Sequence, residues 1–170
     1  MNLEQCLSVA REDNTAFKEI YDLTINRVYS FVLLRVRSKE LALDICQDTY
    51  LSFWKSLPNF KYMSDSQFYA FLFKVARRQL IRARTKMRET VELDEAYDIP
   101  SEDGEKEDYR MLIKKVRNLK EPERLCVELR YFKDLKFQDI AEILGVSENN
   151  AKVLHFRAIK KLKEDLQIYE

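Results

Sequence analysis

The chain has 170 residues, of which 46% are hydrophobic, and its formal net charge at pH 7 is +1. This length suffices for one domain of ordinary size or two small ones, and the apolar content excludes wholesale disorder. Only two glycines and three prolines are present. Because β-rich proteins need many turn residues and phosphate-cradling enzymes need glycines, this scarcity predicts an all-α fold.

Charge is distributed unevenly along the sequence. The segment Lys74–Arg88 holds seven basic residues and no acidic one, whereas Glu89–Asp108 holds ten acidic residues and one lysine. Basic residues become frequent again after Lys152. Such segregation indicates that different segments contact different partners.

Several classes of protein are disfavoured by what the sequence lacks. The three cysteines are widely spaced without a CxxC pair, which is typical of free thiols in a reducing compartment. There is no signal-peptide core and no run of ~18 apolar residues, so we expect a cytoplasmic protein without membrane insertion. Without a glycine-rich loop, a metal-ligand cluster or a histidine beside a nucleophile, we expect no enzyme, no cofactor and no metal site.

Apolar spacing and capping residues predict the first helices. Apolar residues recur at intervals of three and four over residues 15–35, which indicates an amphipathic helix. Ser38 is the expected N-cap of a second helix, which should end before Pro58 because the residue preceding a proline disfavours helical backbone. A third helix should begin at a capping box formed by Ser64 and Gln67.

The second of these helices has an acidic side. On a helical wheel, its buried side holds Leu41, Ala42, Ile45, Cys46, Thr49 and Phe53. The opposite side holds Asp44, Gln47, Asp48 and Leu51. An acidic face with one exposed leucine is suited to docking a basic partner helix, although a solvated face explains the same pattern.

The third helix has a basic side. Its buried side should hold Phe68, Phe71, Leu72, Val75 and Gln79. Its other side carries Lys74, Arg77, Arg78 and Arg84. Basic groups can follow a phosphate backbone, and the aromatic residues between Phe60 and Phe73 can stack on unpaired bases, which makes this region a candidate for binding single-stranded nucleic acid. A solvated basic face beside core aromatics is the alternative.

The acidic stretch separates two predicted domains. It contains Pro100 and Gly104 and shows no sustained period, so residues 91–107 are expected to form a flexible linker between domains at residues 1–90 and 108–170. The helical pattern resumes at Tyr109, and Pro122 suits the first turn of a further helix.

A helix-turn-helix is predicted near the C-terminus. A short helix over residues 137–144 should end at Gly145, and Ser147 is the expected N-cap of a final helix running to about Leu166. The exposed side of that helix offers Asn149, Asn150, Lys152, Val153, Phe156, Arg157 and Lys160. Asparagine can bond base edges, cations can bond phosphates and apolar groups can meet a thymine methyl, so duplex DNA is the expected ligand. A helical hairpin with a solvated face is the alternative.

Five segments resemble motifs of the sigma-70 family of RNA polymerase sigma factors, in particular its extracytoplasmic-function (ECF) group. Ala42–Tyr50 resembles A-x-D-x-x-Q-[DE], and Phe71–Arg77 resembles W-L-[YF]-x-I-A-R. Leu119–Arg124 resembles L-P-x-x-x-R, Ile140–Ser147 resembles I-A-E-I-L-G-[IV]-S, and Arg157–Leu162 resembles R-A-R-x-x-L. The segments occur in the family's order and cover nearly the whole chain.

The resemblance implies a sigma factor with a region 2 bundle and a region 4 helix-turn-helix, which directs core RNA polymerase to promoters. The residues implied to bind the clamp coiled coil of the core enzyme are Asp44, Gln47, Asp48 and Leu51. Those implied to bind the −10 element are Lys61, Tyr62, Ser64, Lys74, Arg77, Arg78 and Arg82. Those implied to bind the −35 element are Asn149, Asn150, Lys152, Val153, Phe156 and Arg157. Further implied partners are the polymerase flap and an anti-sigma factor.

The sequence also departs from the family's motifs. Phe71 replaces a tryptophan, Arg78 replaces the usual asparagine, and Arg82 replaces the usual aspartate, which makes the third helix more basic. The common T-V-K-S-R of the recognition helix reads Asn150–Leu154, which leaves the −35 sequence open. The acidic linker would either enter basic polymerase channels or act as a solvated tether. A conventional helix-turn-helix regulator that binds duplex DNA without polymerase is the alternative function.

Overall fold

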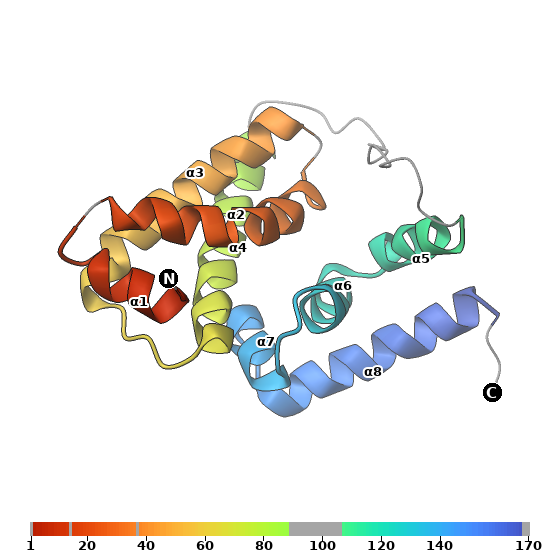
Figure 1. The fold of residues 1–170 in the computed structure, drawn as a ribbon. Coiled ribbons are helices and arrows are strands. Elements are labelled where there is room, and N and C mark those ends of the chain that lie inside the picture. Colours follow the sequence, from red (N-terminus) through yellow and green to blue (C-terminus); the bar gives the residue numbers. More distant parts are fainter. Residues whose placement is uncertain (1, 14, 37, 89–106, 168–170) are drawn as a thin grey trace. The chain divides into compact units, whose positions relative to one another are not determined.

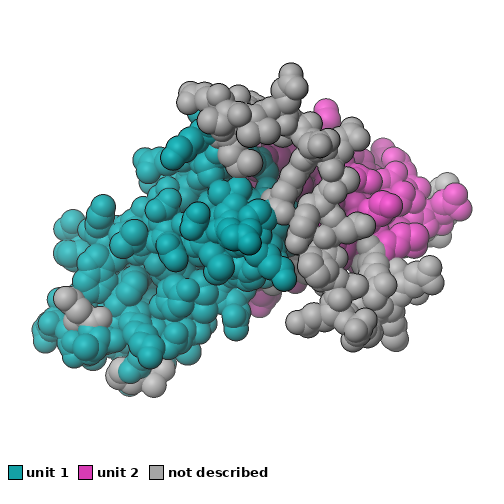
Figure 2. Space-filling view, turned by 90° about the horizontal axis from the view of Figure 1, so that it is seen from above, with its two compact units in different colours: residues 1–98 teal, residues 99–170 magenta. Residues whose placement is uncertain are grey.

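The computed structural model describes residues 2–13, 15–36, 38–88 and 107–167. Within these ranges the regular secondary structure is entirely helical, which confirms the predicted all-α fold (Figure 1). The chain divides into two compact units, residues 1–98 and 99–170, coloured separately in Figure 2. The predicted linker at 91–107 lies outside the described residues except for its last position, which begins a helix.

The first unit is a helical bundle in which the helix over residues 39–56 lies against two others. Its helices are α1 (Leu3–Val9), α2 (Ala16–Leu33), α3 (Lys39–Ser56), η1 (Leu57–Asn59) and α4 (Asp65–Arg88). Helix α3 packs against both α2 and α4, and α1 packs against α2 (Figure 1). The predicted helices therefore form one hydrophobic core.

The first helix, α1, is absent from the sequence prediction. Asn2 and Gln5 form a reciprocal capping box, with N–H to side-chain oxygen distances of 2.9 and 3.0 Å. The helix buries Leu3, Cys6 and Leu7. At seven residues it is too short for apolar periodicity to stand out.

Capping side chains and a proline mark the helix boundaries in this unit. The Ser38 hydroxyl accepts a hydrogen bond from the Leu41 N–H at 3.1 Å, which confirms the predicted N-cap of α3. The Ser64 hydroxyl accepts from the Gln67 N–H at 3.2 Å at the start of α4. Helix α3 ends at Ser56, before Pro58, as predicted.

Aromatic side chains fill the core of the first unit. Phe31, Phe53, Phe68 and Phe73 are fully buried. The Phe53 ring lies 5.5 Å from Phe68 and 5.8 Å from Phe60, both in edge-to-face geometry. The burial of Phe68 confirms its predicted place on the buried side of α4. The suggestion that these aromatic residues stack on unpaired bases is wrong for Phe73, because its ring is enclosed by protein.

A polar contact is buried between α2 and α3. The hydroxyls of Thr24 and Tyr50 are 2.7 Å apart, and the Thr24 hydroxyl donates to the carbonyl of Ile20 at 2.6 Å. Satisfying both hydroxyls removes the cost of burying them. The contact fixes α2 against α3, which positions the surface described below.

The second unit is built around the final helix. Its helices are α5 (Glu107–Asn118), α6 (Glu121–Val127), the π-helical η2 (Glu128–Phe132), α7 (Phe137–Leu144) and α8 (Glu148–Asp165). Helix α8 packs against α5, α6 and α7. Pro122 lies in the first turn of α6, as predicted.

An ion pair joins α6 to α8. The buried carboxylate of Glu123 accepts two hydrogen bonds from Nζ of Lys161, at 2.7 and 2.9 Å. Beside it, an apolar cluster closes the interface between α5, α6 and α8, formed by Val116, Leu119, Val127, Ala158 and Leu162. A buried charge that is paired in this way sets the register of α8 on α6.

The helix-turn-helix forms with the predicted boundaries. Gly145 ends α7 in the left-handed conformation, with φ of 71°. A Cβ added at this position would meet nothing within 4 Å, so glycine is needed for backbone conformation rather than for space. The Ser147 hydroxyl accepts from the Asn150 N–H at 3.2 Å and starts α8.

The N-terminus of α7 lacks a side-chain cap. Lys136 occupies the N-cap and makes no side-chain capping bond, and Asp134, two residues earlier, has a positive φ of 56°. A cation at a helix N-terminus also opposes the helix dipole.

We therefore predict that Lys136→Ser stabilises the second unit by about 1 kcal/mol, because serine supplies the missing cap. Ser147→Ala, which removes an existing cap, should destabilise it by a similar amount. Amide hydrogen exchange of α7 and α8 in the full chain measures both effects separately from the first unit. Slower exchange in Ser147→Ala, or faster exchange in Lys136→Ser, would contradict this account of the caps.

Candidate functional site

One exposed side of α3 is acidic. Asp44, Gln47 and Asp48 are exposed, and Leu51 beside them is 58% exposed. The opposite side of α3 is buried, as predicted, through Ala42, Ile45, Cys46, Thr49 and Phe53. Because the buried side fixes the rotation of the helix, the four exposed residues are held together as one surface.

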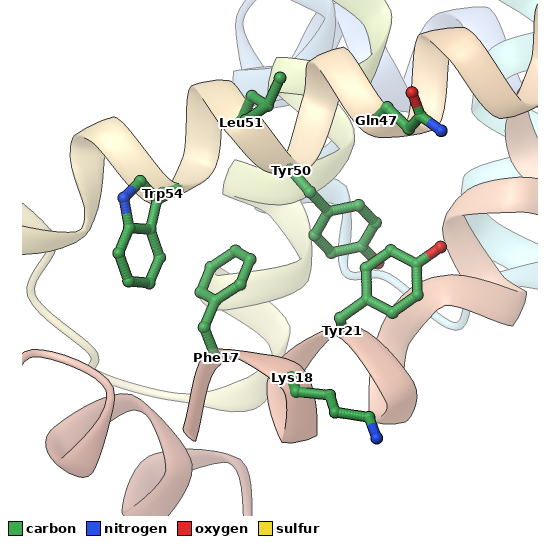
Figure 3. A pocket seen from close by; sticks show the side chains of 7 residues that line it. All are labelled: Phe17, Lys18, Tyr21, Gln47, Tyr50, Leu51 and Trp54. Carbon is green, nitrogen blue, oxygen red and sulfur yellow. The ribbon is translucent and has the colours of Figure 1, made fainter. Parts of the chain in front are cut away.

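An apolar groove adjoins this surface (Figure 3). It has a volume of about 630 Å³ and lies between α2 and α3. Its lining residues are Phe17, Lys18, Tyr21, Gln47, Tyr50, Leu51 and Trp54. Since Gln47 and Leu51 belong to both features, the groove and the acidic residues form one continuous face.

Aromatic packing shapes the groove. The Phe17 ring meets Trp54 edge-to-face, with ring centroids 4.7 Å apart, and Tyr21 lies 4.7 Å from Tyr50. Burial raises the pKa of Tyr50, so its hydroxyl stays neutral at physiological pH. Sequence reasoning missed the groove because three of its seven lining residues come from α2, and no pattern within α3 reveals that contribution.

The basic side of α4 is narrower than predicted. Arg78 and Arg82 are exposed, whereas Lys74 and Arg77 are half-buried. Arg84 turns toward the end of α2, where its guanidinium donates to the Arg35 carbonyl at 3.5 Å. Arg84, which was predicted for the same basic face, is thus half-buried like Lys74 and Arg77 and contacts its own unit.

The segment before α4 presents a second group of predicted residues. Lys61 and Ser64 are exposed, and Met63 is 76% exposed. The half-buried Tyr62 donates its hydroxyl to the Asp65 carboxylate at 2.7 Å, which raises the pKa of Tyr62 to about 12. Ser64 and Arg82 are separated by roughly 27 Å along α4, so the predicted residues form an extended track rather than one compact site.

The exposed side of α8 carries all the residues predicted for it. Asn149, Asn150, Lys152, Val153, Phe156, Arg157 and Lys160 are exposed. Lys152 forms an ion pair with Glu148 one turn earlier, at 2.7 Å. The opposite side is buried through Ala151, Ala158 and Leu162, which fixes this face toward solvent.

His155 ties α8 to η2. Its Nε2 lies 3.1 Å from the Tyr131 hydroxyl, the two rings stack at 5.5 Å, and the Phe137 ring meets His155 at 5.2 Å. Burial, with a smaller effect from Arg130, lowers the pKa of His155, so the ring is neutral at physiological pH. His155 is therefore a packing residue.

The described residues contain no group of three or more histidine, cysteine or acidic side chains that could hold a metal ion. The three cysteines are free, as predicted, and the structure buries all of them. Burial raises the pKa of Cys46 to about 12 and that of Cys126 to about 11. No helix in the described ranges is long and apolar enough to cross a membrane.

Comparison with known families assigns both units. The family model described as sigma-70 region 2 matches residues 20–90, which include α3 and α4. The model described as sigma-70, region 4 matches residues 109–162, which include the helix-turn-helix. The chain belongs to the sigma-70 family, in its ECF group. The acidic face and the basic track thus lie in region 2, and the exposed side of α8 lies in region 4.

Related proteins support the assignment over most of the chain. The ECF sigma factor SigM of Bacillus subtilis is 28% identical over 154 residues, which cover 85% of this chain and 91% of the relative. The ECF sigma factor SigK of Mycobacterium tuberculosis is 26% identical over 169 residues, which cover 94% of this chain and 90% of the relative.

Two solved structures share the fold. The sigma factor RpoE from Bartonella quintana, in complex with the anti-sigma factor NepR, has a TM-score of 0.74 at 23% identity and covers 91% of this chain and 98% of its own. CnrH, in complex with the cytosolic domain of CnrY, has a TM-score of 0.66 at 16% identity and covers 98% of this chain and 96% of its own.

Proposed function

We propose that this chain binds core RNA polymerase in the cytoplasm and directs promoter-specific initiation through −10 and −35 recognition. The observation that carries the proposal is the match to regions 2 and 4 in chain order, with a separate exposed polar face in each. Catalysis belongs to the core enzyme, and the sigma factor supplies the binding energy that selects and opens a promoter. Family membership favours this function over a conventional helix-turn-helix regulator.

The acidic face of α3 is the proposed contact with the polymerase clamp. Asp44 and Asp48 supply negative charge to a basic partner helix, and Gln47 supplies hydrogen bonds. Leu51 and the adjoining groove offer apolar area beside these charges. Charged groups set partner orientation and association rate, while buried apolar area adds affinity, so this face combines both contributions.

The track along α4 is the proposed contact with the −10 element. The exposed Arg78 and Arg82 are suited to gripping the phosphates of a displaced strand, since guanidinium groups form strong hydrogen bonds with phosphates. Lys61, Tyr62 and Ser64 lie at the other end of the track, where a flipped base would be held. Lys74 and Arg77 are half-buried, so their charges lie closer to the helix and extend less far toward a bound strand.

The exposed side of α8 is the proposed reader of the −35 element. The second helix of a helix-turn-helix lies in the major groove, with its N-terminal residues at the base edges. Asn149, Asn150, Lys152, Val153, Phe156 and Arg157 occupy this part of α8.

An anti-sigma factor is a further proposed partner. RpoE, which shares the fold, was solved in complex with the anti-sigma factor NepR, and CnrH was solved in complex with the cytosolic domain of CnrY. A protein that covers the acidic face and groove of α3 would exclude the polymerase from the same surface. We therefore propose regulation by steric competition at region 2.

Charge reversal at the acidic face tests the proposed function directly. Asp44→Arg with Asp48→Arg should reduce co-purification with core RNA polymerase at least about tenfold, because like charges then face each other across the contact. The matched control is Glu4→Arg with Glu12→Arg, which reverses two exposed charges elsewhere in the same unit. Equal retention of core polymerase by the two double variants would refute the contact, and no binding by wild type would refute the function.

Removing the exposed arginines tests the −10 contact. Arg78→Ala with Arg82→Ala should reduce promoter opening about tenfold while core binding is unchanged, because two charge-assisted phosphate bonds are lost. Fluorescence of 2-aminopurine placed in the −10 element measures the opening. Lys39→Ala with Lys55→Ala removes the same charge from exposed positions on α3 and should have little effect. Parallel loss of core binding and opening would argue against a separate strand contact.

Lys152 tests the −35 contact. Lys152→Ala should weaken holoenzyme binding to promoter duplex and reduce the slope of log affinity against log salt by about 0.9, the value for one phosphate contact. Filter binding of a promoter fragment over a salt series measures the slope. Lys114→Ala, at an exposed position on α5, should leave the slope unchanged. An unchanged slope in Lys152→Ala would remove this residue from the phosphate contacts.

A further inference from the structure

Two large apolar side chains are exposed at the centre of the recognition face of α8. Phe156 is 70% exposed and Val153 is 44% exposed. Positions three apart in a helix lie on the same side of adjacent turns, so the two side chains form one apolar surface. Asn149 and Lys160 extend that line by one turn in each direction.

The fold of the second unit gives no reason for this apolar surface. Helix α8 packs against its neighbours through Ala151, Ala158 and Leu162, which lie on its other side. The apolar cluster of the unit is completed without Val153 or Phe156. An exposed pair of this size inside a polar, basic face is therefore better explained by a ligand than by folding.

Charge around the pair indicates what the ligand is. Lys152, Arg157 and Lys160 are exposed on the same side of α8 and surround the two apolar side chains. An apolar centre with a cationic surround complements a DNA major groove, in which phosphates border the groove and thymine presents a C5-methyl group on its floor. No other base of unmodified DNA offers a methyl group there.

We propose that Val153 and Phe156 read thymine methyl groups in the −35 element, an inference that rests on the proposed function. The −35 element of this sigma factor accordingly contains A·T pairs whose thymines lie beneath these two side chains. Where the sigma-70 motif has serine, this chain has Val153, which replaces a hydrogen-bonding hydroxyl with two methyl groups. That replacement shifts the preferred contact from a polar base edge toward a methyl group.

The helix that carries the pair is rigidly held. Ser147 caps its first turn, Ala151 is fully buried beneath it, and the His155–Tyr131 contact fixes its third turn against η2. A helix that is already held in place loses little conformational entropy on binding, so less of the free energy of a methyl contact is offset.

The test compares thymine with uracil, which differs only by the absent methyl group. The full chain, assembled with core RNA polymerase, first selects promoter fragments from a library randomised across the −35 element. Each thymine of a selected element is then replaced by uracil. At one or more positions the wild-type holoenzyme should bind uracil DNA about fourfold more weakly, the effect of one buried methyl group. In Phe156→Ala or Val153→Ala the thymine and uracil fragments should bind equally at the position that each side chain reads.

Two controls separate methyl readout from other roles. Lys160→Ala should weaken binding to thymine and uracil fragments by the same factor, because a phosphate contact is independent of the base. If no thymine is sensitive to uracil replacement, or if the sensitivity persists in both alanine variants, the proposal is wrong. Lower affinity for core polymerase in Phe156→Ala, with thymine sensitivity intact, would identify the pair as a protein contact and also overturn it. Selection of no fragment by the wild-type holoenzyme would instead overturn the proposed function.

Discussion

The packing of α3 between α2 and α4 is the constraint on which the first unit depends. Phe53 lies at the centre of that interface and its ring contacts residues from the segments before and within α4. The apolar side of α3 is buried against its neighbours, so rotating the helix would expose that side to water. The acidic residues on its other side therefore face outward. The same interface places Phe17 and Tyr21 beside them and thereby creates the groove. One packing arrangement thus produces both the stability and the proposed polymerase-binding face.

In the second unit, the short helix α7 and its turn fix the direction of the longer helix α8. Gly145 turns the chain through the left-handed region, and the Glu123–Lys161 ion pair sets the register of α8 from the other side. His155 and Tyr131 add a contact at the third turn of α8, beside the residues proposed to meet bases. Helix α8 buries Ala151, Ala158 and Leu162 against its neighbours, which leaves its opposite side available for sequence recognition.

Local sequence signals predicted the elements that depend on neighbouring residues. Ser38, Ser147 and Gly145 each satisfy backbone requirements within a few positions, so the boundaries they predict agree with the structure. The alternation of buried and exposed positions along α3 and α8 was also predictable, because it follows from helical periodicity. The proposed site residues on α3 and α8 are therefore exposed where the sequence placed them.

Features that depend on distant segments were not predictable in the same way. The groove needs Phe17 and Trp54 to meet across two helices, and the guanidinium of Arg84 donates to the Arg35 carbonyl beyond the end of α2. Phe73 is suited chemically to base stacking, yet it is buried against Phe31. In each case the partner lies at least 37 positions away along the chain, and a single sequence contains no local signal for it.

The burial of all three thiols has a consequence for how signals reach this protein. A thiol reacts with peroxides or disulfides as its thiolate and needs access to solvent. Cys6, Cys46 and Cys126 are enclosed in the two cores, and burial raises the pKa of each. In the folded chain these three thiols are thus poor targets for mild oxidants, and none of them is suited to act as a direct redox sensor.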